Sequence, residues 1–226
     1  MTAATALAPE VLARIVESIS AVHEAGHAVV AAYLRVPFKY ATLDPTKEEM
    51  EPHVSLPNLL IVMRSLSYNK KTDSFRIRSE DELQQEICRR LQNHAVMILG
   101  ARAAVDSFYP FFMTNSEECY QYDEEQLREY AKAKICIGGL LTRQNSTASL
   151  DIPDNSFTEW REKMLSRARQ IVSIPYVEAA IRTVEYELIM KRKVSAPRVR
   201  EILRQEKQYT AHTAWLASQE VRGGVQ

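Results

Sequence analysis

The residues with the clearest chemical meaning are His23, Glu24 and His27, which form the pattern HExxH inside a largely apolar run. Because the two histidines are four positions apart, a helix brings both imidazoles to one face, where they can share a metal ion. Glu24 then lies beside them, within reach of a metal-activated water. This combination is typical of zinc-dependent hydrolysis, so we expect His23 and His27 to bind Zn²⁺ and Glu24 to act as general base.

A catalytic zinc ion takes three ligands from the protein and leaves its fourth position to water or substrate. Residues 30–33 read Val-Ala-Ala-Tyr, so the continuation HExxHxxGxxH, which supplies a third histidine, is missing. An aspartate or glutamate elsewhere is therefore required. His94 has no partner at ligand spacing and is expected in the core. Spacing alone leaves five carboxylates open as the third ligand: Asp106, Glu117, Glu118, Asp123 and Glu124.

The elements that must position these residues can be predicted from hydrophobic periodicity. Apolar residues recur every three to four positions over residues 9–36, which predicts one long zinc-binding helix or two in tandem, ended by Pro37. Gly26 costs about 1 kcal/mol relative to alanine inside a helix, so its presence indicates close packing there. Residues 38–43 favour a short strand, as the edge of a small sheet within about residues 38–66, where an extended substrate could add.

The remainder of the chain is expected to be mainly helical. Capping patterns and periodicity predict helices over residues 80–106 and 120–142 and a group of C-terminal helices over residues 156–206. The fold class is therefore mainly α, of the α+β type, with a small β-sheet. We expect a single domain over residues 1–206, followed by a frayed C-terminal tail, residues 207–226.

Composition excludes several other classes of protein. The 226 residues contain 29 Lys+Arg and 29 Asp+Glu, so the net charge of +0 provides no field for binding nucleic acid. The 6 glycines form neither a phosphate-binding P-loop nor a dinucleotide-binding fingerprint. The 3 cysteines include no CxxC pair, which favours a reducing compartment. No stretch has the length and apolar character of a signal peptide or membrane span, so we expect a cytoplasmic protein without a membrane partner.

Three segments in the same order resemble the peptidase domain of the FtsH-type AAA proteases. They read HEAGHAVVAAYL, PFKYATLDP and ELQQEICRRLQNHAVMILGARAAVDSF, where that family has HEAGHA, a strand KVTIIPRG and a helix ending GGRAAEE. A weaker similarity extends over residues 164–203. The resemblance implies a helical, zincin-like metallopeptidase fold. In the family, the aspartate of a segment like ASNDLERATxIA is the third zinc ligand, and the equivalent step here, YDEEQLREYA, contains Asp123. The resemblance therefore selects Asp123, with Asp106 and Glu117 as alternatives.

The resemblance also implies a function. It indicates a metalloendopeptidase of the HExxH zincin type, a hydrolase that cleaves a polypeptide substrate. The 226 residues include no equivalent of the family's ATPase module, so activity is expected to be ATP-independent on its own. A separate ATPase partner and a homo-oligomer both stay open. The alternative is a non-catalytic zinc-binding or adaptor domain derived from such a peptidase. Glu24 favours the enzyme, because a closed structural zinc site needs a fourth protein ligand and no carboxylate beside the motif.

Overall fold

The computed structural model describes residues 8–44, 53–54, 66–69, 74–77, 80–110, 123–128 and 154–223. Most of these residues are helical, and the rest include two small antiparallel sheets, which confirms the predicted mainly α class. The helices are α1 (Pro9–Leu34), α2 (Glu80–Phe108), α4 (Asp154–Val172), α5 (Pro175–Lys191) and α6 (Ala196–Gly223). The strands are β1 (Tyr40–Thr42), β2 (His53–Val54), β3 (Leu66–Asn69), β4 (Ser74–Ile77) and β5 (Lys193–Ser195). Residues 123–128 are also helical.

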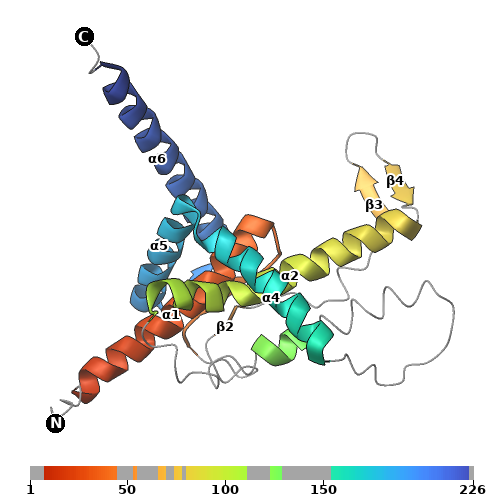
Figure 1. Ribbon diagram of the computed structural model, residues 1–226, viewed down its shortest axis with the longest axis horizontal. Coiled ribbons are helices and arrows are strands. Elements are labelled where there is room, and N and C mark those ends of the chain that lie inside the picture. Colours follow the sequence, from red (N-terminus) through yellow and green to blue (C-terminus); the bar gives the residue numbers. More distant parts are fainter. Residues whose placement is uncertain are drawn as a thin grey trace.

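Helix α1 is the central element of the molecule. It packs against α2, α5, α6 and α4, and Figure 1 shows it crossing α2 near the middle of the structure. The helix is continuous, as one of the two predictions had it, and Pro9 suits its first turn because the missing N–H needs no partner there. It ends at Arg35, which adopts a left-handed conformation with φ of 59°. Its C-terminal half is buried, and this half contains the HExxH motif.

The three-stranded sheet corrects the prediction for the substrate-binding edge. Its strand order is β2-β1-β5, so β1 lies in the centre, with Ala41 paired to Val54 on one side and to Val194 on the other. The strand expected at residues 38–43 exists, but both of its edges are occupied, and an extended peptide cannot add to it. The prediction was wrong because β5 lies far along the chain, in the short connection between α5 and α6.

Strands β3 and β4 form a separate antiparallel hairpin in which Leu66 pairs with Ile77. Figure 1 places this hairpin at the N-terminal end of α2, away from the crossing with α1. The predicted sheet range, residues 38–66, therefore contains two strands of the main sheet and only the start of this hairpin. Residues 45–52 and 55–65 of that range lie outside the described residues.

The helix predictions are confirmed for residues 80–106, where α2 continues to Phe108, and for residues 156–206, where α4, α5 and α6 lie. Of the helix expected over residues 120–142, the structure describes only 123–128, which is helical. The prediction of a frayed tail over residues 207–226 was wrong, because α6 continues to Gly223. In Figure 1 this helix projects from the body of the molecule. Good helix formers and the absence of proline after Pro197 explain this extension. Within the described part of the chain, no helix is apolar over enough residues to cross a membrane.

Candidate metal centre

The two histidines of the motif lie one turn apart on the buried half of α1. Their Nε2 atoms are 3.1 Å from each other, and the rings meet edge to face. Glu24, which is 3% exposed, follows His23 on the same helix, and its Oε1 lies 3.9 Å from His23 Nε2. One ligand atom from each of these three residues can be chosen so that all lie within 4.8 Å of one another. The helix therefore brings the HExxH side chains together as the spacing predicts.

Asp123 approaches the same two histidines from the helical segment 123–128. Its Oδ2 lies 3.3 Å from His23 Nε2, and its Oδ1 lies 3.4 Å from His27 Nε2. The side chain is 13% exposed, so the carboxylate is largely shielded from water. Of the candidate carboxylates that the structure describes, Asp106, Asp123 and Glu124, Asp123 is the one that it places against both histidines.

The donor atoms fit a tetrahedral zinc ion. Ligand bonds of 2.0–2.1 Å require ligand atoms about 3.3–3.4 Å apart in a tetrahedron. The Nε2 atoms of His23 and His27 are 3.1 Å apart, and each lies 3.3 to 3.4 Å from one of the two Asp123 oxygens, Oδ2 for His23 and Oδ1 for His27. Asp123 Oδ2 is buried and accepts no hydrogen bond from the part of the chain that the structure describes. Two nitrogens and a carboxylate oxygen are also ligands that zinc prefers, so the residues present suit this ion.

The main-chain carbonyl of Met97, on α2, orients His27. His27 Nδ1 lies 3.2 Å from the Met97 oxygen in a buried environment. A carbonyl can only accept a hydrogen bond, so Nδ1–H must donate it, and Nε2 is left facing His23 and Asp123. Such a partner fixes the ring and the nitrogen that binds a metal. No sequence pattern could predict this contact, because any residue supplies a backbone carbonyl.

Burial and charge give the two histidines different proton affinities. Burial lowers the pKa of His23 to about 4, against the opposing effect of the Asp123 carboxylate. For His27, burial also disfavours the charged ring, but Asp123, Glu24 and the Met97 carbonyl outweigh it and raise the pKa to about 9. Although burial opposes it, the charges of His27 and His23 hold the pKa of Asp123 below its usual value. The cluster thus places a buried carboxylate where a cation is favoured.

A close approach of two helices keeps Met97 near His27. A Cβ added to Gly26 on α1 would lie 2.7 Å from the Gly100 carbonyl oxygen and 2.8 Å from Ala101 Cα on α2. A Cβ added to Gly100 would lie 2.8 Å from a methyl group of Val30. The two glycines therefore allow the helices to come nearer than side chains would permit. This confirms the packing role predicted for Gly26.

The other predicted site residues lie elsewhere or outside the described residues. Asp106 Oδ2 accepts a hydrogen bond from Arg169 at 3.0 Å, and Glu124 is bound by Arg161. His94 is buried, as expected, with its Nδ1 2.8 Å from the carbonyl oxygen of Arg90, and burial lowers its pKa. The remaining candidates, Glu117 and Glu118, lie outside the described residues.

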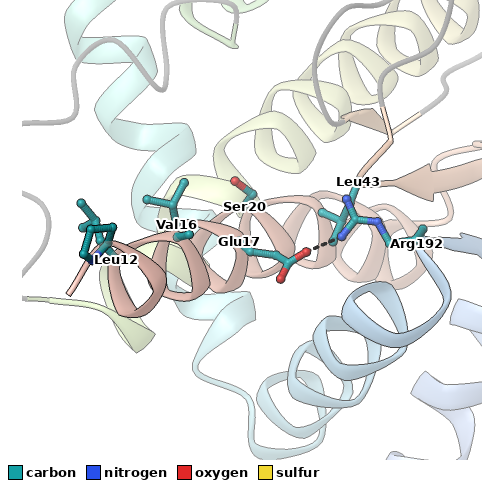
Figure 2. Close-up of a pocket in the computed structure, with 8 residues that line it drawn as sticks. Leu12, Val16, Glu17, Ser20, Leu43 and Arg192 are labelled. Carbon is teal, nitrogen blue, oxygen red and sulfur yellow. Dashed lines mark hydrogen bonds and ion pairs between the residues drawn. The ribbon is translucent and has the colours of Figure 1, made fainter. Parts of the chain in front are cut away.

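An open apolar groove of 510 Å³ runs along the N-terminal half of α1. Its lining includes Leu12 and Val16, which are 50% and 55% exposed, and Figure 2 shows them in line with Ser20. Glu17 forms an ion pair with Arg192 at one side of the groove. Positions 16, 20, 23 and 27 follow the spacing of one helical face, so the groove lies on the face of α1 that bears the histidines.

Comparison with models of known protein families gave no match to this chain, and none of the curated proteins searched is similar to it.

Proposed function

We propose that this protein is a zinc-dependent metallopeptidase, a hydrolase of the HExxH zincin type and of the FtsH peptidase type. The observation that supports this best is the spacing of 3.1 to 3.4 Å among the ligand atoms of His23, His27 and Asp123, which suits one tetrahedral zinc ion with an open position. The motif resemblance supports the same reading. A cytoplasmic location, suggested by the three cysteines, belongs to this proposal as well.

Each residue has a defined role in the proposed reaction. His23, His27 and Asp123 would hold the zinc, and Met97 would keep His27 Nε2 directed toward it. When bound, Zn²⁺ polarises a carbonyl group and lowers the pKa of water to about 7. The Glu24 carboxylate would take the proton from the attacking water and pass it to the leaving amine. Its burial next to His23 excludes bulk water, which strengthens its interaction with charge that develops during the reaction.

The apolar groove on α1 is the surface that we propose for the substrate, because both edges of β1 are already paired. Ser20, which lines the groove, is three residues before His23 on the same helix face. The volume of the groove, 510 Å³, lies in the range typical of ligand pockets. We therefore expect apolar side chains of an extended polypeptide to lie along Leu12 and Val16. A separate ATPase that delivers such a polypeptide, and assembly of several copies, remain compatible with this proposal.

Cleavage of an unfolded protein substrate, such as casein, tests the proposed reaction. We expect zinc-loaded protein to cleave casein and Glu24→Gln to bind zinc equally while losing at least about 100-fold in rate, since general base catalysis contributes about 10²–10⁴-fold. Full activity in a folded, zinc-loaded Glu24→Gln variant would contradict the role of Glu24. A zinc-loaded wild type that cleaves no unfolded protein or peptide would favour the non-catalytic zinc-binding domain instead.

A further inference from the structure

The proposed third ligand, Asp123, belongs to the described helical residues 123–128, which are separate from α1. Its carboxylate oxygens reach the two histidines of α1 from outside that helix, at 3.3 and 3.4 Å. Both histidines, in contrast, project from the 26-residue helix α1. The position of the Asp123 carboxylate therefore depends on what holds this segment in place.

Helix α4 supplies an ion pair and a cation–π contact to residues 123–128, and Leu127 is buried in the common core. Arg161 donates hydrogen bonds from Nη1 to both carboxylate oxygens of Glu124, each at 3.3 Å. The guanidinium of Arg128 lies 4.4 Å from the ring centroid of Phe157. Leu127, 1% exposed, belongs to the hydrophobic core that also includes Phe157.

The ion pair is the contact nearest to the metal ligand. Glu124 directly follows Asp123, so the bond to Arg161 fixes the backbone next to the ligand. The Arg161 side chain is only 25% exposed, and it also binds Glu162, its neighbour on α4, at 3.0 Å. A guanidinium held by two carboxylates has little freedom to move, because its planar donors match their oxygens.

We propose that Arg161 is a positioning residue for the metal centre, which acts on the zinc through Glu124 and Asp123. This inference rests on the proposed zinc site, and it assigns the α4 helix a function that the HExxH motif does not reveal. Arg161 does not touch the ligand atoms. Its effect would be to hold the Asp123 carboxylate where the two histidines need it.

Zinc affinity of the full chain, measured by competition with a chelator of known affinity, tests the proposal. Arg161→Ala should weaken zinc binding about 10–100-fold, the range found when a partner of a metal ligand is removed. Arg161→Lys keeps a positive charge facing Glu124 and should recover most of the affinity. The matched control is Arg169→Ala, which removes another arginine from α4 and its ion pair with Asp106, and should change the affinity less than about twofold.

A double-mutant comparison separates positioning from a general loss of structure. If Arg161 acts only through Asp123, then Arg161→Ala should cause no further loss of zinc affinity when Asp123→Ala is already present. Independent losses that multiply in the double variant would overturn the proposal, as would unchanged affinity in Arg161→Ala. If Arg161→Ala does not fold, Glu124→Gln weakens the same ion pair and takes its place.

The same titration distinguishes this proposal from the proposed function. A wild type that binds no zinc overturns both, because there is then no centre to position. A wild type that binds zinc, together with an Arg161→Ala variant of equal affinity, overturns the role of Arg161 alone. The Co²⁺ absorption spectrum gives a second readout: Arg161→Ala should shift the bands of the wild type toward those of Asp123→Ala.

Discussion

Replacing Gly26 by alanine should separate α1, which carries the two histidines, from α2, whose Met97 carbonyl orients His27. The added Cβ would lie 2.7 Å from the Gly100 oxygen, 2.8 Å from Ala101 Cα and 2.9 Å from Ala104 Cβ. The first two are backbone atoms, which cannot rotate away. Ordinary contact needs about 3.5 Å, so α2 would have to recede by about 0.7 Å.

The expected magnitudes follow from this displacement. Overpacking of a core costs about 1–3 kcal/mol. We expect a cost near the upper end of this range, because the added Cβ meets backbone atoms. The higher helix propensity of alanine offsets about 1 kcal/mol of this cost. The net loss in the free energy of unfolding should be about 2 kcal/mol. Met97 is one turn from Gly100, so its 3.2 Å contact with His27 would lengthen to about 3.9 Å and be lost as a hydrogen bond. Zinc affinity should then fall about 10–100-fold.

Two measurements check this prediction. Urea unfolding with zinc removed reports the packing cost, and chelator competition reports zinc affinity. Arg14→Ala is the control, because it adds an alanine at an exposed position of the same helix, away from α2. Gly100→Ala, which approaches Val30 from the opposite side, should act in the same direction as Gly26→Ala. A Gly26→Ala protein with wild-type stability and zinc affinity would refute the reasoning that the close crossing positions Met97.

Two further predictions concern the groove and the packing of α5 against α6. Val16→Asp should raise KM for an apolar peptide at least about 10-fold with little change in kcat. The control is Val11→Asp, because Val11 is 44% exposed but does not line the groove, and KM should stay unchanged. Equal effects of the two substitutions would argue against substrate binding in the groove. Glu187→Gln should lower the free energy of unfolding by about 1 kcal/mol at pH 7. Hydrogen bonds from Arg198 hold the pKa of Glu187 below its ordinary 4.5, so its contribution is present above that pH and is lost as the pH falls further. Urea unfolding of both proteins at pH 7 and pH 3 should show the difference shrinking at the lower pH, and a constant difference would contradict this.

Helix α1 and its HExxH motif could be predicted because their determinants are local. The periodicity of α1 and the spacing of His23 and His27 follow from 3.6 residues per turn, and the glycine in their midst indicated a close neighbour. Asp123 could not be chosen by spacing, since nothing local relates it to a helix 100 residues earlier. The family resemblance selected it, and the structure places it against both histidines.

What the sequence did not predict depends on contacts between distant segments. Strand β5 has only three residues, with no periodicity to detect, yet it pairs along β1 and closes the edge that was assigned to substrate. The contact of the Met97 carbonyl with His27 could not be predicted either, because a backbone group leaves no sequence pattern. The ion pair of Arg161 with Glu124 joins residues 37 positions apart, so it has no local signal. The extension of α6 was missed for a different reason: it depends on local helix propensity, and residues 207–215 are almost all exposed, so no packing pattern marks them.

The most direct test of the central claim is the zinc content of the protein, compared between the wild type and Asp123→Ala. The proposed centre predicts about one zinc ion per wild-type chain after purification without added metal. It also predicts a marked loss of zinc in folded Asp123→Ala, because the two histidines alone leave the ion one protein ligand short. A wild type that remains free of zinc even after zinc is supplied, or an Asp123→Ala variant that retains it fully, would contradict the three-ligand centre.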